Sequence, residues 1–204
     1  MFMICLDLEG ILTPEVWINV ALKTGIDELK LTTRDISDYD VLMKRRLEIL
    51  RKNKIPLKDI QDVISKMDLL DGAREFLDWL RSVAQVIILT DSFIEFAMPL
   101  MKKLGFPAVL CHDLETNNDG MIADYKLRIK NMKLNSVQAF KNMKYETIAV
   151  GDSYNDIEML KEAKHGILFR PPENVIKEFP QFPVVKEYKE LKKLMSQYLG
   201  LINS

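Results

Sequence analysis

Three short apolar stretches that each run into acidic or hydroxyl side chains constrain this 204-residue chain more than any other feature. Stretches of this length, rich in Ile and Val and followed by turn residues, are typical of buried strands in a parallel sheet. They are FMICLDLEG at residues 2–10, VIILTDS at residues 86–92 and TIAVGDSYND at residues 147–156. The carboxyl ends of such strands meet at one edge of the sheet, where open α/β sheets bind ligands. The sequence therefore predicts a ligand site where these stretches end.

Helical patterns separate the predicted strands. Helices are predicted at residues 73–82, 93–104 and 187–199, and further short strands at residues 107–112 and 166–169. Pro99 predicts that the second of these helices is kinked or split, because proline lacks the backbone N–H that a helix interior needs. The alternation of strand and helix predicts an α/β fold with a doubly wound, Rossmann-like parallel sheet.

The segment after the first strand has a different character. It contains no convincing strand, and helices are predicted at residues 15–24, about 38–52 and 57–67. We expect residues 14–68 to form a helical cap over the carboxyl edge of the sheet, inserted in an α/β core made of residues 1–13 and 69–204. In residues 114–128, an Asn-Asp-Gly turn between two alternating runs predicts a small β-hairpin.

Composition argues against nucleic acids and membranes as partners. The chain has 29 Lys and Arg against 30 Asp and Glu, a formal net charge of −1, which offers no cationic surface for a phosphate backbone. Asp7 and Glu9 interrupt the first apolar run too early for a signal peptide, and no later stretch approaches the ~18 apolar residues that span a bilayer. Cys5 and Cys111 lie within apolar stretches, which is typical of free buried thiols. We expect a cytoplasmic protein.

The first chemical motif is the pair of carboxylates Asp7 and Glu9. In an extended strand, residues two apart point to the same side, so both can face one site. One carboxylate could attack phosphorus, while the other protonates the leaving oxygen and later activates the acceptor. A pair of solvated acids at a strand end explains this motif about as well when it is taken alone.

The second motif is Gly151-Asp152-Ser153-Tyr154-Asn155-Asp156. Its two carboxylates form an oxygen-rich cluster suited to Mg²⁺, and the ion would reduce the repulsion between an anionic nucleophile and an anionic substrate. The same residues also suit the N-cap of the following helix, a role that does not exclude metal binding.

The third motif is Thr90-Asp91-Ser92, whose hydroxyl and backbone N–H groups could hold phosphate oxygens. Taken singly, a Thr at this position is more often a strand-end hydrogen bonder. A lysine is also needed to offset the charge of a transferring phosphoryl group. The candidates are Lys126, Lys130, Lys133 and Lys141, and periodicity does not choose among them.

As a set, these motifs resemble the haloacid dehalogenase superfamily of phosphotransferases. The stretches CLDLEGILTPE, VLMKRRLEIL, LTDSF, GDSYNDIEML and GILFRPPENVIKEFPQFP make the whole chain similar to its phosphoserine phosphatase branch, and closest to the bifunctional phosphoserine phosphatase/homoserine phosphotransferase members. In the superfamily pattern the second acidic position is usually Asp, whereas this chain has Glu9, as the bifunctional members do. The resemblance implies hydrolysis of O-phospho-L-serine and transfer of its phosphoryl group to L-homoserine.

The resemblance also assigns roles to individual residues. It implies that Asp7 is the nucleophile, Glu9 the acid/base and Lys133 the lysine that neutralises the phosphoryl group. It implies a Mg²⁺ cofactor held by Asp7, Glu9 and Asp152, and a substrate bound by Glu15, Arg46, Thr90, Asp91, Lys133 and Asn155. Glu15 would pair with the substrate ammonium, and Arg46 would hold its α-carboxylate through two parallel hydrogen bonds. Without the resemblance, Glu15 and Arg46 are ordinary surface charges.

Other interpretations of the sequence remain open. One is a phosphatase for another small phosphomonoester, and a second is a signalling receiver module, which also forms an aspartyl-phosphate beside Mg²⁺. A receiver accepts phosphate after a middle strand and lacks a helical insertion of this size, and an inactive scaffold does not need so complete a set of motifs. We interpret His112 and His165 as structural or surface residues. We expect Trp17 to pack in the cap and Trp79 in the core. An exposed apolar helix face is compatible with a homodimer.

Overall fold

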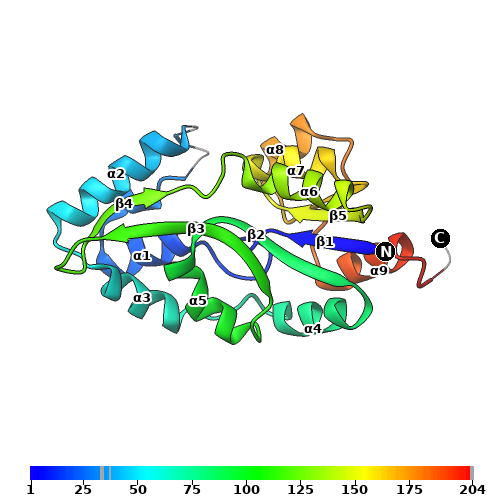
Figure 1. The fold of residues 1–204 in the computed structure, drawn as a ribbon, viewed down its shortest axis with the longest axis horizontal. Helices are drawn as coiled ribbons and strands as arrows, with labels where there is room; N and C mark the ends of the chain where they lie inside the picture. The colour runs from blue at the N-terminus through cyan, green and yellow to red at the C-terminus, as the bar shows by residue number, and fades with distance from the viewer. Residues whose placement is uncertain (33–34, 37, 203–204) are drawn as a thin grey trace.

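A seven-stranded sheet forms the centre of the computed structural model, which describes residues 1–32, 35, 36 and 38–202 (Figure 1). The strand order is β4-β3-β2-β1-β5-β6-β7, and every neighbouring pair is parallel except β3 and β4. The strands are β1 (Phe2–Leu6), β2 (Gln85–Phe93), β3 (Ala108–Thr116), β4 (Ile122–Lys126), β5 (Glu146–Gly151), β6 (His165–Phe169) and β7 (Val184–Val185). The predicted doubly wound α/β fold is confirmed.

Helices cover both faces of this sheet. The α-helices are α1 (Val16–Thr24), α2 (Tyr39–Lys52), α3 (Leu57–Lys66), α4 (Ala73–Val83), α5 (Ile94–Lys103), α6 (Met132–Asn142), α7 (Ile157–Glu162), α8 (Glu173–Glu178) and α9 (Tyr188–Tyr198). Two short 3₁₀ helices, Asp27–Lys30 and Tyr154–Asp156, complete the described elements. Helices α4, α5 and α9 supply buried side chains to one apolar cluster, and α6, α7 and α8 supply them to another.

The two-residue period of the strands divides their side chains between these clusters. Ile4 and Leu6 of β1 belong to the cluster with α4, α5 and α9, whereas Cys5 between them belongs to the cluster with α6, α7 and α8. Both faces of β1 are therefore apolar, as expected of a central parallel strand. Cys5 and Cys111 are free and buried, as predicted.

Pro99 does not split α5, contrary to one of the two outcomes predicted from the sequence. A residue without an N–H at this position leaves the carbonyl of Glu95, four residues earlier, without its helical partner. The amide of Gln61, on α3, donates to that carbonyl at 3.0 Å. A side chain of α3 therefore satisfies the helix bond that Pro99 removes, and it ties α3 to α5.

The hairpin prediction was right in position, but β3 is longer than expected. The strand predicted at 107–112 and the first hairpin strand form one continuous element, which pairs with β2 at its start and with β4 at its end. In the turn, Oδ1 of Asn117 accepts hydrogen bonds from the N–H groups of Asp119 and Met121, and Gly120 has a φ of 74°. The carbonyl of Gly120 accepts from the N–H of Leu57 at 2.9 Å, which joins the hairpin to the start of α3.

Helices α1, α2 and α3 lie beyond the carboxyl end of β1 and beside the carboxyl half of β3, at the left of Figure 1. Helix α3 packs on α1 and α5, and α2 packs on β4. The hydroxyl of Tyr125, on β4, donates to the carboxylate of Asp40 on α2. These helices agree with the ranges predicted for residues 14–68, while the division of the chain into a core and a separate cap stays a prediction. Across the described residues, no helix combines the length and apolarity that crossing a membrane requires.

Candidate active site

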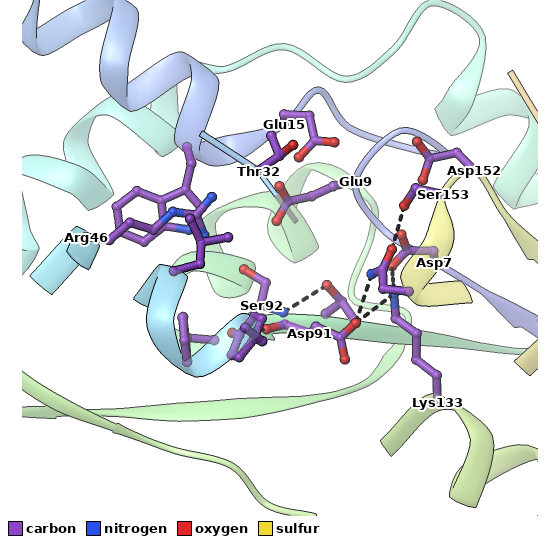
Figure 2. Close-up of a pocket in the computed structure, with 16 residues that line it drawn as sticks. Asp7, Glu9, Glu15, Thr32, Arg46, Asp91, Ser92, Lys133, Asp152 and Ser153 are labelled. Carbon is purple, nitrogen blue, oxygen red and sulfur yellow. Dashed lines mark hydrogen bonds and ion pairs between the residues drawn. The ribbon is translucent and has the colours of Figure 1, made fainter. Parts of the chain in front are cut away.

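A cavity of about 100 Å³ lies at the carboxyl edge of the sheet, between the strand ends and α1 and α2 (Figure 2). Its lining contains every site residue expected from the sequence. These residues are Asp7, Glu9, Glu15, Arg46, Thr90, Asp91, Lys133, Asp152 and Asn155. Segments up to 148 residues apart in the chain thus contribute to one site, from Asp7 to Asn155.

Asp7 follows directly after β1, and its position is fixed by backbone pairing. Its N–H donates to the carbonyl of Val150 on β5 at 3.0 Å, so the backbone pairing of β1 with β5 continues as far as Asp7. Gly10 then turns the chain with a φ of 78°. A Cβ atom on Gly10 would lie 2.7 Å from the carboxyl group of Asp152, so only glycine lets this loop come so close to the second acidic motif.

Lys133, in the first turn of α6, is the lysine that reaches the cavity. Its ammonium lies 3.0 Å from Oδ1 of Asp7, 3.1 Å from Oδ2 of Asp91 and 2.8 Å from Oδ1 of Asp156. Burial lowers the pKa of Lys133, but the three carboxylates raise it by more, and the net pKa is well above its ordinary value. Lys133 is therefore a permanent cation in this site. The other candidates, Lys126, Lys130 and Lys141, are exposed.

Asp156 holds the acidic loop in place. The side chain has no exposed surface, and its Oδ2 accepts the N–H groups of Asp152 at 3.0 Å and Ser153 at 3.2 Å. A Cβ atom on Gly151 would lie 2.3 Å from Cβ of Asp156, so glycine is required there as well. The sequence left the role of Asp156 open. In the structure it links Lys133 to the loop after β5.

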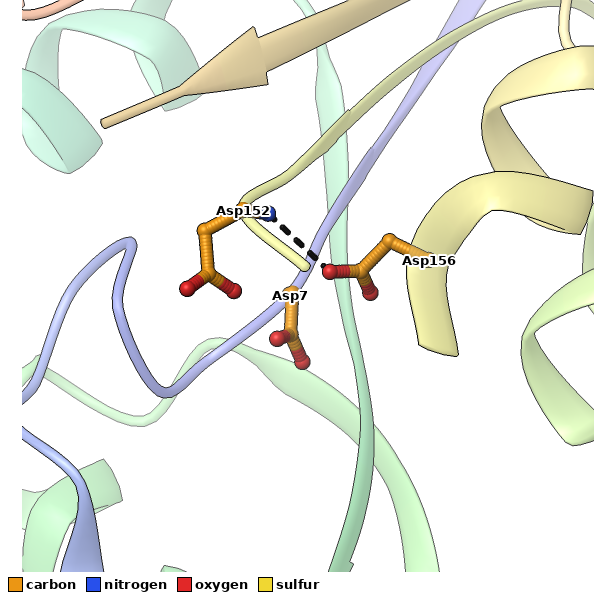
Figure 3. Close-up of side chains that lie close together, drawn as sticks. All are labelled: Asp7, Asp152 and Asp156. Atoms are coloured by element: carbon orange, nitrogen blue, oxygen red, sulfur yellow. Dashed lines mark hydrogen bonds between the residues drawn. The ribbon is translucent and has the colours of Figure 1, made fainter. Parts of the chain in front are cut away.

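Asp7, Asp152 and Asp156 form a buried carboxylate cluster, shown in Figure 3. One oxygen from each lies within 4.8 Å of the others. Burial raises the pKa of Asp7 well above its ordinary value, and the charges of Asp156 and Asp152 raise it further against the opposing effect of Lys133. Three buried carboxylates that share one lysine as a countercharge fit a hard divalent cation such as Mg²⁺. The side chain of Glu9, expected among the metal ligands, is not a member of this cluster.

The side chain of Glu9 instead turns toward α1. Its Oε2 accepts the N–H of Val16 at 2.8 Å, at the start of that helix, and its carboxyl group is hydrogen-bonded to Glu15. Burial, followed by the charge of Glu15, raises the pKa of Glu9 to about 8. The Val16 N–H and Arg46 oppose this effect without cancelling it. The raised pKa favours the protonated form of Glu9 near neutral pH.

Arg46 enters the cavity from α2. It is only 6% exposed, and its Nη2 donates to the carbonyl of Leu31 at 2.8 Å. Its guanidinium lies 4.6 Å from the ring centroid of Trp17, a favourable cation–π geometry. Within the described part of the chain, its buried Nε–H has no acceptor. A buried donor without an acceptor at a cavity wall indicates a place for an anionic ligand.

Thr90, Asp91 and Asn155 form the remaining wall. The Thr90 hydroxyl accepts the N–H of Ser92 at 3.2 Å, and the amide of Asn155 donates to Oδ2 of Asp91 at 2.9 Å. The hydroxyl of Tyr39, on α2, donates to the backbone carbonyl of Asp91 at 2.9 Å. Tyr39 thus connects α2 to the end of β2 at the cavity.

Sequence reasoning missed Tyr39, and it treated Trp17 and His112 only as structural residues. Trp17 packs as predicted but also lines the cavity, and His112 lies behind Asp91 with only 3% of its surface exposed. His112 sits at the sheet position opposite Phe93, where β2 ends, so it is a further polar residue at the same edge. The polar end of the apolar stretch before His112 was the signal that could have found it.

The family model for haloacid dehalogenase-like hydrolases matches residues 4–164. The chain belongs to this family. Phosphoserine phosphatase ThrH of Pseudomonas aeruginosa is 59% identical over 189 residues, which cover 93% of this chain and 92% of the relative. A phosphoserine phosphatase of Pseudomonas syringae pv. tomato is also 59% identical over 189 residues, covering 93% of this chain and 80% of the relative. The family match rules out the receiver interpretation and confirms the resemblance found in the sequence.

Solved structures of the family share this fold. A phosphoserine phosphatase in the apo form superimposes with a TM-score of 0.77 at 22% identity, covering 94% of this chain and 97% of the other. A phospho-aspartyl intermediate analogue of phosphoserine phosphatase gives a TM-score of 0.76 at 20% identity with the same coverage. At these identities the comparison establishes the fold alone.

Proposed function

We propose that this hydrolase is a Mg²⁺-dependent phosphoserine phosphatase that forms an aspartyl-phosphate on Asp7 and also passes its phosphoryl group to L-homoserine. The observation that carries the proposal is the contact of 3.0 Å between Asp7 and Lys133 inside a cavity that also holds Glu15 and Arg46. The first pair supplies a nucleophile and a countercharge for a phosphoryl group, and the second supplies one anion and one cation for an amino acid. The 59% identity to two phosphoserine phosphatases supports the same substrate.

In the first step, a carboxylate oxygen of Asp7 attacks phosphorus in line with the departing serine oxygen. The P–O bond to serine breaks, and the protonated Glu9 donates its proton to that oxygen, so that L-serine leaves neutral at the hydroxyl. Lys133 donates to the phosphoryl oxygens and stabilises the charge that they carry in the transition state. Thr90 and Asn155 are proposed to hold the same oxygens.

In the second step, a hydroxyl group attacks the phosphorus of the aspartyl-phosphate and restores the Asp7 carboxylate. Glu9, now ionised, accepts the proton of the attacking hydroxyl, which returns the site to its starting state. Water as the acceptor yields inorganic phosphate, and homoserine as the acceptor yields O-phosphohomoserine. The enzyme would thus link serine and threonine biosynthesis in the cytoplasm.

The amino-acid end of the substrate is proposed to lie between Glu15 and Arg46. Glu15 would accept from the ammonium group, and the unpartnered Nε–H of Arg46 would donate to the α-carboxylate together with an Nη–H group. Trp17 keeps the guanidinium plane in place for this contact. Homoserine carries the same ammonium and carboxylate groups, so the same pair can orient it as an acceptor.

Asp7 and Asp152 are proposed to hold Mg²⁺, with Asp156 completing the acidic cluster. When bound, the ion would neutralise phosphoryl oxygens and lower the repulsion between Asp7 and its substrate. Glu9 was also expected as a ligand, and its side chain would have to leave the Val16 N–H to take that role.

The extra methylene of Glu9 relative to Asp suggests how an alcohol could compete with water. It places the acid/base group farther from the backbone, which we expect to leave room for the larger acceptor. Glu9→Asp should therefore change the ratio of free phosphate to phosphohomoserine. An unchanged ratio would contradict this explanation without affecting the proposed hydrolysis.

The proposal is tested by incubating the protein with ³²P-labelled phosphoserine and Mg²⁺, with and without homoserine. We expect labelled phosphate in the first case and additional labelled phosphohomoserine in the second. Preference for another phosphomonoester by kcat/KM would favour the second candidate, a related phosphatase with a different substrate. Absence of phosphohomoserine would remove the transferase part alone.

A further inference from the structure

Three carboxylates surround the ammonium of Lys133, where a phosphoryl group would bind. An ammonium has three N–H groups, and three carboxylates lie within hydrogen-bond distance of it, at 2.8 Å (Asp156), 3.0 Å (Asp7) and 3.1 Å (Asp91). A phosphoryl oxygen that binds Lys133 must therefore replace one of them. The structure indicates which one.

Asp156 cannot leave easily. Its side chain has no exposed surface, and its second oxygen is held by the backbone N–H groups of Asp152 and Ser153. Asp7 is the attacking group and is 6% exposed at its side chain, so it stays beside the phosphorus during the reaction. Asp91 differs from both because 30% of its side chain is exposed at the cavity wall.

Asp91 also has other hydrogen-bond donors within reach if it leaves Lys133. Its Oδ2 already accepts from the amide of Asn155 at 2.9 Å. Its Oδ1 lies 3.9 Å from Nε2 of His112, just beyond hydrogen-bond distance. Nδ1 of His112 accepts the N–H of Arg128 at 3.2 Å, so the neutral ring carries its proton on Nε2 and offers it to Asp91. A small rotation of Asp91 would make this hydrogen bond.

We propose that the Asp91 carboxylate is an internal anion that occupies the phosphoryl position on Lys133 in the free enzyme and turns toward His112 when a phosphoryl group arrives. This inference rests on the proposed phosphatase function and assigns Asp91 a role other than direct substrate binding. Return of Asp91 to Lys133 displaces the product phosphate. Asp91 therefore lowers product inhibition, and it also lowers the ground-state affinity for the phosphorylated substrate. His112 is the positioning residue that binds the Asp91 carboxylate after it leaves Lys133.

The test measures binding of inorganic phosphate to the Mg²⁺-loaded protein by calorimetry and as a competitive inhibitor of phosphoserine hydrolysis. Asp91→Asn removes the competing charge, and we expect it to bind phosphate at least about tenfold more tightly, because like charges at this spacing repel strongly near a protein surface. Asp91→Ala removes the whole carboxyl group and leaves no polar group in its place, and it should act in the same direction. Asp113 lies on β3, the strand next to β2, and forms an exposed ion pair with Arg128. Asp113→Asn is the matched control, since it removes an equal charge from that pair.

Two substitutions of His112 separate positioning from simple packing. His112→Asn keeps an acceptor for the Arg128 N–H but loses the donor toward Asp91, so phosphate should bind more weakly. His112→Gln keeps a donor near the Nε2 position and should bind phosphate more nearly as the wild type does. In the Asp91→Asn background, His112→Asn should have little further effect on phosphate binding, because the carboxylate that His112 is proposed to bind is no longer present.

Unchanged or weaker phosphate binding in Asp91→Asn, relative to Asp113→Asn, overturns the inference. Equal effects of His112→Asn with and without the Asp91 carboxylate also overturn the part assigned to His112. In either case, hydrolysis of phosphoserine by the wild type leaves the proposed function intact. A wild-type protein that binds phosphate but does not hydrolyse phosphoserine would contradict the proposed function instead.

Discussion

The ammonium of Lys133 lies 2.8 Å from Oδ1 of Asp156, a carboxylate that has no exposed surface. The contact joins the first turn of α6 to the loop after β5, two segments 23 residues apart in sequence. Asp7 and Asp91 contact the same ammonium. Lys133 is thus the common countercharge of three carboxylates from three strand ends, and the geometry of the site depends on it.

Replacement of Lys133 by Met should therefore impair both stability and catalysis. The variant leaves buried carboxylates without a partner, so we expect the free energy of unfolding to fall by about 3–5 kcal/mol. Loss of the phosphoryl countercharge should lower kcat by at least about 10²-fold. Urea denaturation and steady-state kinetics measure the two effects. Lys141→Met, on the same helix with an exposed partner in Glu162, should change neither by much, and equal losses in both variants would contradict the prediction.

Asp7→Asn should separate activity from stability. An amide is a poor nucleophile, so turnover should fall by at least about 10⁴-fold. The raised pKa of Asp7 means that the folded state favours its protonated form, so its ionised form destabilises the fold as pH rises above the ordinary carboxyl range. In metal-free buffer at pH 7, Asp7→Asn should melt at a higher temperature than the wild type. The difference should shrink as the pH is lowered and Asp7 takes up its proton.

The fold and the strand-end part of the site could be predicted because both depend on local patterns. A buried strand needs an apolar run, and the polar residue that ends it reaches the edge of the sheet. Asp7, Thr90 and Asp152 were found on that basis alone, and all line the cavity. The whole of β3 was not found, because its partner changes from β2 to β4 and the sequence does not show where one pairing gives way to the other.

Residues whose roles depend on packing between distant segments could not be found from local pattern. Lys133 resembles the exposed lysines around it, and only the family resemblance singled it out. Arg46 lies in a cluster of basic residues on α2, yet it alone of that cluster is buried, against Trp17. Tyr39 has no local signal for its hydrogen bond to Asp91, which is 52 residues away in sequence.

Arg46→Lys should weaken recognition of the substrate carboxylate specifically. Lysine cannot make the two parallel hydrogen bonds of a guanidinium, and it loses the stacking on Trp17. We expect kcat/KM for phosphoserine to fall by at least about tenfold. The matched substrate is O-phosphoethanolamine, which lacks the carboxylate and should be hydrolysed equally by both proteins. A parallel loss on both substrates would show that Arg46 acts on the site as a whole.

Asp152→Asn should raise the Mg²⁺ concentration needed for activity. The amide has one oxygen donor and no charge, so it is a weaker ligand for a hard cation than the carboxylate. A titration of activity with Mg²⁺ should give a half-maximal concentration at least about tenfold higher than for the wild type. Mg²⁺ should also raise the melting temperature of the wild type more than that of the variant, since a ligand stabilises the folded state to which it binds. Identical titrations would exclude Asp152 as a ligand.

The pKa of Glu9, raised to about 8 by burial and then by the charge of Glu15, predicts an alkaline limit to activity. Glu9 holds its proton below that pH and can protonate the departing serine, whereas above it the ionised group cannot. The kcat/KM for phosphoserine should therefore fall as pH rises through about 8. This alkaline limb of the pH profile should vanish in Glu9→Gln, whose amide does not titrate. Glu15→Gln removes a neighbouring charge and should move the limb to lower pH, toward the ordinary carboxyl value. O-phosphoethanolamine supplies the same leaving-group chemistry without the carboxylate that contacts Arg46, so the limb should persist with it. A limb that Glu15→Gln leaves unmoved would assign the titration to a group other than Glu9.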